Sequence, residues 1–113
     1  MIVEERNYQI KTGLLQEFWE LYKNEGLPIQ TKYQPYPIGF FTIDIGEISN
    51  FVHMWKYDSY EHREDCRKKL HKDASWGIYA KKSHNYILKM STRILKPLEY
   101  EFTNHIWHPT RKG

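Results

Sequence analysis

The sequence predicts a single α+β domain whose strands and helices follow one another in the order β-α-β-β-α-β. Its 113 residues match the usual size of one domain and are too few for two. Segments rich in β-forming residues lie at 2–10, 38–57 and 87–95, and amphipathic segments separate them. Such a pattern indicates two layers, a sheet and a set of helices that cover one of its faces.

The first strand and the first helix have clear sequence signals. Ile2–Ile10 is rich in β-formers, and its polar centre breaks any helical stripe. Leu14, Phe18 and Tyr22 then follow at four-residue steps, which predicts an amphipathic helix of roughly three to four turns. Gly26 is placed to end this helix as the residue after its last turn.

The middle of the chain is expected to form a hairpin. Strands are predicted at Ile38–Ile45 and Ile48–Tyr57, and Gly46-Glu47 supplies a tight turn between them. The preceding segment, Leu27–Tyr33, is ambiguous, because Pro28 is suited to the first turn of a short helix.

The second half of the chain predicts two helices and a final strand. The first of these helices is capped at Asp58-Ser59 and runs to about Leu70, and Asp73 caps the next one. The last strand is expected at Ile87–Leu95. The complete order is the ferredoxin-like arrangement with an antiparallel sheet. One face of the last helix carries Trp76, Tyr79, Ala80 and Ser83.

The domain is expected to span residues 1–97, and residues 98–113 form a C-terminal tail. The tail contains Tyr100, Phe102 and Trp107. Because disordered segments are rarely so aromatic, we expect part of this tail to pack.

Both faces of the predicted sheet carry apolar side chains. In Ile48–Tyr57 one parity holds Phe51 and Trp55, and the other holds Val52 and Met54. A sheet with one solvated face alternates cleanly between apolar and polar residues. We therefore expect a second copy of the chain to cover the second face, which predicts a homodimer.

Composition bounds the class of protein. The net charge is +3 with both signs interspersed, so we expect no nucleic-acid partner. Cys66 is the one cysteine, which excludes an internal disulfide and favours a reducing compartment. We see no signal peptide at the N-terminus and no apolar run long enough to span a membrane. These features predict a cytoplasmic protein.

A candidate small-molecule pocket follows from the parity of two strands. Three residues of the first strand share one face, and so do three residues of the third: Glu4, Arg6, Tyr8, His53, Trp55 and Tyr57. Histidine moves protons near neutral pH, arginine holds carboxylates, and aromatic rings form apolar walls. The alternative is a core histidine that hydrogen-bonds Glu4 or a tyrosine, and we favour this alternative. If His53 instead moves protons, we expect its partner to be a carboxylate or a tyrosine, and Glu4 is the nearest candidate by strand pairing.

Arg63 and Arg67 lie one helical turn apart in the charged helix. They are placed to pair with Asp73 or Glu64, and this is the interpretation we prefer. Alternatively, they frame the mouth of the pocket for an anionic substrate, and we include Arg63 among the candidate pocket residues.

We expect no metal and no cofactor. His105 and His108 are the only close histidine pair, whereas a metal site needs three or four converging ligands. Cys66 lies in mid-helix without a visible partner, so we interpret it as unreactive.

The sequence resembles the NIPSNAP family over roughly residues 1–97. The resemblance lies in Glu5-Arg6-x-Tyr8, in Gly39-x-Phe41 with Gly46, and in Val52-His53-Met54-Trp55-x-Tyr57-x-Ser59, followed by Arg63, Arg67, Leu70, Asp73 and Trp76. The family implies a dimer of ferredoxin-like subunits with back-to-back sheets, a dimeric α/β barrel. It implies no settled reaction, because relatives of the wider fold include monooxygenases, haem-degrading enzymes and dehalogenases.

These observations leave the activity open. We expect a protein that binds a small molecule between its sheet and its helices. One alternative is a cofactor-independent, monooxygenase-like enzyme acting on a small aromatic or carboxylate compound. The other is a non-catalytic scaffold dimer, for which we expect a filled interior, whereas an open pocket with converging polar groups favours a small-molecule site.

Overall fold

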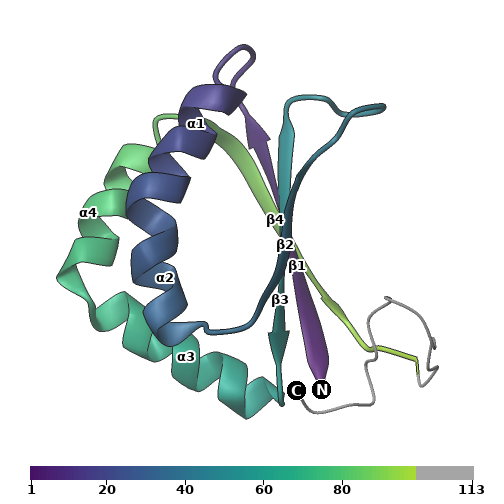
Figure 1. The fold of residues 1–113 in the computed structure, drawn as a ribbon, viewed down its shortest axis with the longest axis vertical. Helices are drawn as coiled ribbons and strands as arrows, with labels where there is room; N and C mark the ends of the chain where they lie inside the picture. Colours follow the sequence, from purple (N-terminus) through teal and green to yellow (C-terminus); the bar gives the residue numbers. More distant parts are fainter. Residues whose placement is uncertain (99–113) are drawn as a thin grey trace.

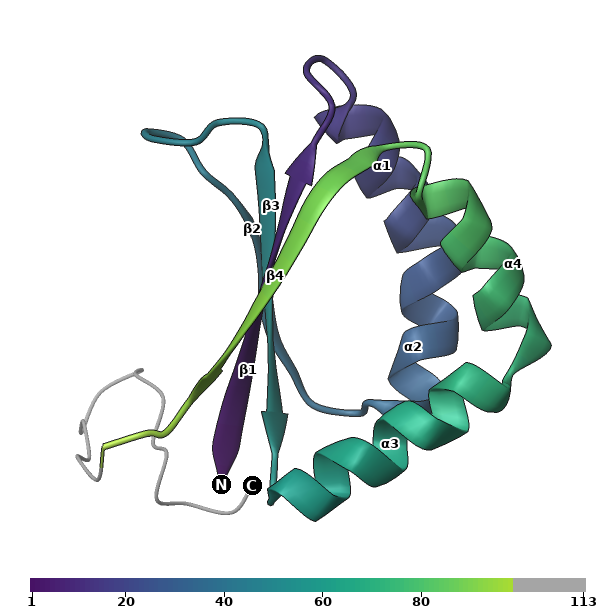
Figure 2. The ribbon, with the colours of Figure 1, turned by 180° about the vertical axis from the view of Figure 1, so that it is seen from behind.

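The computed structural model describes residues 1–98 and has the predicted two-layer architecture. Four strands form one sheet in the order β2-β3-β1-β4, and every neighbouring pair is antiparallel. Figures 1 and 2 show all the helices on the same face of the sheet. In chain order the elements are β1 (Ile2–Ile10), α1 (Leu15–Leu21), a π-helical turn (Tyr22–Gly26), α2 (Leu27–Tyr33), β2 (Pro37–Thr42), β3 (Asn50–Tyr57), α3 (Tyr60–Lys72), α4 (Ala74–Ser83) and β4 (Ile87–Leu95). The ferredoxin-like α+β fold is confirmed.

The β2–β3 hairpin is shorter than predicted. β2 ends at Thr42 and β3 begins at Asn50, so residues 43–49 form a loop instead of strand ends and a tight turn. Ile45 and Ile48 follow a strand-like pattern in the sequence, but both are exposed in this loop. Gly46 adopts a φ of +123°, which a glycine reaches without steric cost and other residues rarely adopt. The β-forming composition was therefore misleading here, because no layer of residues 1–98 covers these side chains.

Gly26 does not end the first helix. The backbone continues through the π-helical turn into α2, and Gly26 itself has a helical φ of −77°. The ambiguous segment Leu27–Tyr33 is helical, with Pro28 in its first turn. A Cβ atom at Gly26 would lie 2.5 Å from Cζ of Tyr79 on α4. The residue is therefore a glycine because the Tyr79 ring packs directly on the backbone.

The caps of the last two helices are as predicted. The Ser59 hydroxyl accepts a hydrogen bond from the backbone N–H of His62 at 3.1 Å, and Asp73 accepts one from the N–H of Ser75 at 2.9 Å. Tyr33 at the end of α2 also donates to Asp73 at 2.7 Å. This carboxylate therefore joins the end of α2 to the junction of α3 and α4.

The core lies between the sheet and the helices and is mostly aromatic. Its larger cluster consists of Tyr8, Ile10, Phe18, Tyr22, Phe51 and Tyr79. A smaller cluster at the other end of the sheet consists of Ile2, Trp55, Tyr57 and Cys66. Phe18 and Phe51 meet edge-on with ring centroids 5.2 Å apart, and Phe18 and Tyr22 are stacked with centroids 6.2 Å apart. The first strand and the helices are thus held by packed rings. The predicted tail residues lie outside the described part of the chain, apart from Leu98.

The two helical glycines give a matched test of this packing. We expect Gly26→Ala to destabilise the protein by roughly 1–3 kcal/mol, because the new methyl group overlaps the buried Tyr79 ring. Gly77→Ala, on α4, meets no atom within 4 Å and should instead stabilise the protein by about 0.5–1 kcal/mol. Urea denaturation of both variants measures the difference. If both changes had the same sign, the close approach of Tyr79 to Gly26 would be wrong.

Candidate functional site

The seven candidate pocket residues gather on the helix-covered side of the sheet. The register between β1 and β3 sets Glu4 opposite Trp55, Arg6 opposite His53 and Tyr8 opposite Phe51. Because side chains alternate along a strand, these residues all face the helices. Tyr57 continues the same parity, and Arg63 reaches the group from α3.

Glu4 is a fully buried carboxylate, and its counter-ion is Arg63. Arg63 approaches the same Glu4 oxygen with Nη2 at 2.7 Å and Nε at 3.2 Å. Arg6 is farther away, with Nη1 at 3.4 Å, and the Tyr57 hydroxyl donates at 3.5 Å. A buried charge persists only when it is paired and hydrogen-bonded. Arg63 therefore fixes α3 to the sheet. It also forms the predicted ion pair with Glu64, at 2.8 Å.

His53 is a core histidine, and its expected pairing with Glu4 is wrong. The indole N–H of Trp55 donates to His53 Nδ1 at 2.8 Å, which requires the ring proton to sit on Nε2. That Nε2 is buried and has no partner among the described residues. Burial, with a contribution from Arg6, lowers the pKa of His53 to about 3. The register explains the error, since it sets Arg6 and not Glu4 across from His53.

A chain of polar side chains runs beneath α2. Tyr22 donates to Gln30 at 2.5 Å, Gln30 donates to Gln34 at 2.8 Å, and Gln34 donates to the Tyr57 hydroxyl. Burial raises the pKa of both Tyr22 and Tyr57, so both hydroxyls keep their protons. The two glutamines are four residues apart on one helix face, a spacing that the ambiguous assignment of this segment hid. The chain ends on Glu4 through Tyr57.

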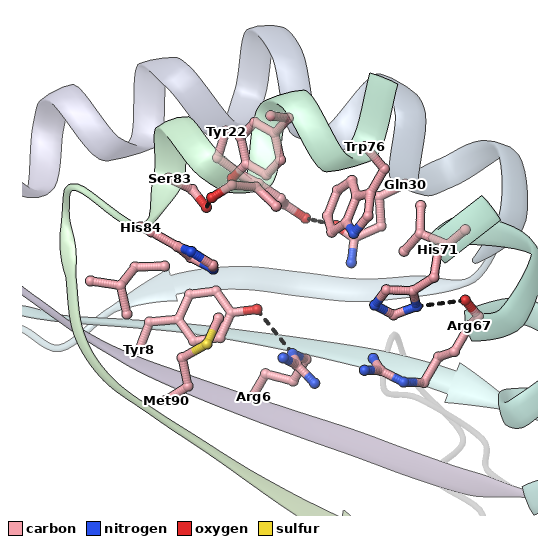
Figure 3. A pocket seen from close by; sticks show the side chains of 14 residues that line it. Arg6, Tyr8, Tyr22, Gln30, Arg67, His71, Trp76, Ser83, His84 and Met90 are labelled. Carbon is pink, nitrogen blue, oxygen red and sulfur yellow. Dashed lines mark hydrogen bonds between the residues drawn. The ribbon is translucent and has the colours of Figure 1, made fainter. Parts of the chain in front are cut away.

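A cavity of about 220 Å³ lies between the sheet and the helices α3 and α4 (Figure 3). The sheet contributes Arg6, Tyr8, Ile87 and Met90. The helical layer contributes Tyr22, Gln30, Arg67, Leu70, His71, Trp76, Tyr79, Ala80, Ser83 and His84. Of the seven candidates, only Arg6 and Tyr8 line this space, and Tyr8 accepts a hydrogen bond from Arg6 Nε at 3.0 Å. The other five do not line it.

Two polar side chains of the cavity wall, Arg67 and His71, come from α3. Arg67 makes no ion pair with any acidic residue that the structure describes, so the preferred pairing with Asp73 or Glu64 is wrong for this residue. His71 Nδ1 lies 2.7 Å from the backbone carbonyl oxygen of Arg67, so Nδ1 must donate. Its Nε2 is then the ring nitrogen that remains available for a hydrogen bond to another group. In Figure 3, His71 sits above Arg67, whose side chain extends toward Arg6.

Sequence reasoning identified one face of α4 but not its role. Trp76, Tyr79, Ala80 and Ser83 do share a face, and that face lines the cavity. The sequence did not identify His71 and His84 as site residues. Each lies near the end of a helix, and no hydrogen-bond partner for either can be recognised from the sequence. The alternative interpretation of Arg67, as a frame for the pocket, agrees with its position.

The remaining candidates carry no further site. Cys66 is buried, and this burial raises the pKa of its thiol, as expected of an unreactive cysteine. Within residues 1–98 no three histidine, cysteine or acidic side chains come together in a way that suits a metal ion. His105 and His108 lie outside the described residues. No helix in the described part of the chain has the length and apolarity to cross a membrane.

The fold is that of a ferredoxin-like α+β protein, and a small cavity lies under its helices. The sequence profile of the NIPSNAP family matches residues 3–101 of the chain. The protein belongs to the NIPSNAP family, as its sequence resemblance indicated.

Similar sequences and structures support this assignment. The chain is 39% identical to NipSnap homolog 3B of Mus musculus over 74 residues, which cover 65% of this chain and 29% of that protein. It is 29% identical to NipSnap homolog 1 of Danio rerio over 97 residues, covering 86% of this chain and 34% of that protein. The chain thus spans about a third of the length of these relatives.

Solved structures extend the comparison to nearly the whole domain. A NIPSNAP family protein from Agrobacterium tumefaciens is 37% identical, with a TM-score of 0.86 over 91% of this chain and 98% of that one. A putative antibiotic biosynthesis monooxygenase from Nitrosomonas europaea has a TM-score of 0.63 at 13% identity, over 87% of this chain and 99% of that one. At that identity the second likeness concerns the fold alone.

The partner and pKa of His53 predict a stability change that depends on pH. We expect His53→Gln to lower stability by roughly 1–3 kcal/mol at pH 7, because the bond from Trp55 is weakened in the core. The native pKa of about 3 lies below the ordinary value of 6.5, so only the unfolded wild type takes up a proton between these values. Wild-type stability therefore falls as pH decreases from 6.5, by up to about 1.4 kcal/mol per unit from this group.

The variant lacks this proton uptake, so the stability difference between wild type and His53→Gln should shrink between pH 7 and pH 5. Urea denaturation at both pH values measures it. A difference that stays constant would show that His53 titrates normally in the folded protein.

Proposed function

We propose that this protein binds a small molecule in the cavity between its sheet and the helices α3 and α4. The observation that carries the proposal is an open space of about 220 Å³ between the sheet and the helices, beside the aromatic core cluster. Polar groups converge on it from three elements, with Arg6 on β1, Arg67 on α3 and His84 after α4. Drug-sized ligands occupy roughly 300–1,000 Å³, so this cavity fits a smaller compound, about the size of a single ring.

The cavity weighs against the alternative of a scaffold with a filled interior. It gives no support to an enzyme in which His53 moves protons, because His53 does not line the cavity and burial favours its neutral form. Whether chemistry follows binding stays a separate hypothesis. The monooxygenase among the structural relatives shares the fold and not the sequence, so its activity does not transfer by likeness.

Filling the cavity tests the proposal. We expect single-ring fragments such as benzoate, benzamide and phenol to shift the indole NMR resonance of Trp76, which lines the cavity. Ala80→Phe places a ring in the same space and should abolish these shifts. Ala74→Phe, at the exposed start of α4, is the matched control and should leave them unchanged. Thermal melts establish that both variants fold, and equal shifts in both would contradict the site.

We also propose that two copies pair through the helix-free face of the sheet. Apolar side chains on this face include Phe41, Val52 and Met54, in register on β2 and β3. Phe41 lies over Gly39, and about half of its surface is exposed. Charged residues share the face, among them the Glu5–Arg93 pair. A fold relative from an uncultured marine organism, described as a dimeric ferredoxin-like protein, has a TM-score of 0.72 at 14% identity, over 90% of this chain and 92% of that one.

A lysine on this face should separate the two copies. We expect the wild type to elute at about twice the chain mass, measured by light scattering after gel filtration, and Met54→Lys to elute as a monomer, because pairing would bury an unpaired charge. Ile78→Lys, at an exposed position on α4 on the helical side, is the control and should remain dimeric. A wild type that is monomeric at micromolar concentration would refute the pairing.

A further inference from the structure

We infer that the cavity selects a small organic monoanion, and that its preferred ligand class is a single-ring aromatic carboxylate. This inference rests on the proposed small-molecule site and adds the chemistry that the site recognises. Three features carry it: an arginine without a counter-ion, the charge balance around Glu4, and the aromatic wall opposite the arginines.

The first feature is the free guanidinium of Arg67. Its neighbours on α3 are engaged elsewhere, since Glu64 pairs with Arg63 at 2.8 Å and Asp65 with Lys69 at 3.0 Å. Within residues 1–98 no carboxylate pairs with Arg67, although the residue is half-buried and lines the cavity. A guanidinium keeps its charge at all accessible pH values, so it needs an anion or water in this position.

The second feature is the charge balance of the surrounding cluster. Glu4 is already bound by Arg63 through two nitrogens, so Arg6, at 3.4 Å, retains charge that this carboxylate does not fully offset. Within residues 1–98, three arginines, Arg6, Arg63 and Arg67, face two glutamates, Glu4 and Glu64, which leaves one positive charge. No acidic residue is among those that line the cavity in the described chain.

The geometry directs this surplus charge into the open space. In Figure 3 the side chains of Arg6 and Arg67 extend toward one another from the sheet and from α3. Two like charges that approach each other in a partly buried site repel, and an anion between them removes the repulsion. A carboxylate offers two oxygens, one for each guanidinium, and such charge-assisted hydrogen bonds are the strong ones. One net positive charge matches a monoanion better than a doubly charged phosphate.

The third feature is the wall that faces the arginines. Trp76 and Tyr79 on α4 lie with ring centroids 5.1 Å apart, and Met90 and Ile87 close the side formed by β4. These surfaces favour an apolar, planar body. The anion is therefore organic, with its charged end at the arginines and its ring toward α4.

Affinities of matched probes test the selection. We expect benzoate to bind at least about tenfold more tightly than benzamide, its neutral isostere, since hydrogen bonds to charged groups differ from neutral ones by this order. Both are titrated into the full chain and followed by the Trp76 indole resonance. Inorganic phosphate should fail to displace benzoate at equal concentration, because it lacks the ring.

Two variants on the same helix assign the effect. Arg67→Gln should remove most of the preference for benzoate over benzamide, and Arg67→Lys should retain part of it, because lysine keeps the charge but loses the planar fork. Lys68→Gln removes an equal charge from an exposed position outside the cavity and should leave the preference unchanged.

The outcomes separate this inference from the proposed function. If benzamide and benzoate bind equally and Ala80→Phe blocks both, the cavity is a binding site without anion selection, and the inference is overturned alone. If no fragment shifts Trp76, both are overturned. The inference is also overturned if phosphate displaces bound benzoate as effectively as added benzoate does. It is likewise overturned if Lys68→Gln loses the preference for benzoate over benzamide to the same extent as Arg67→Gln.

Discussion

The buried carboxylate of Glu4 is the constraint on which the helical layer depends. A charge with no solvent exposure must be met by partners from the elements that cover it. Arg63 supplies the counter-charge from α3, and Tyr57 links the same carboxylate to the glutamine chain beneath α2. Removing Arg63 would leave the carboxylate with only the longer contacts to Arg6 and Tyr57, which is costly in a low-dielectric interior. The position of α2 and α3 over β1 is therefore set by polar contacts as well as by packing.

The space under the helices has an aromatic part near β3 and a part with polar walls near β4. On the β3 side, rings fill the interior, and even His53 is held there as a neutral ring among aromatic side chains. On the β4 side, the wall includes charged and polar groups whose solvation resists collapse into a dry core. Arg6 stands at the boundary, bonded to Tyr8 within the packed part and open to the cavity on the other side. Arg6 and Arg67 therefore line this cavity from the sheet and from α3.

Strand periodicity in the sequence predicted the sheet more accurately than it predicted the partners within the site. β1 and β4 have the expected bounds, because their composition and their cover agree. Residues 43–49 have the composition of strand ends but lack a covering layer, so their pattern misled. Gly26 is of the residue type that commonly ends a helix. Its role is instead to leave room for the ring of Tyr79, and only the three-dimensional packing reveals this contact. The same holds for His53. Parity predicted its face correctly, but its neighbour across the strands depends on the register, which sets Arg6 and not Glu4 opposite it.

Arg63 and Arg67 show why such roles resist prediction from spacing. They lie one turn apart on the same helix and have similar acidic neighbours, so sequence assigns them equal chances of an ion pair. In the fold, Arg63 lies over the buried Glu4 and becomes its counter-ion. One turn further along α3, Arg67 has no carboxylate beneath it in the described chain and faces the cavity instead. The difference arises from what the sheet presents under each turn of the helix. One acid of β1, Glu4, makes Arg63 a structural counter-ion, and Arg67 is left facing the cavity.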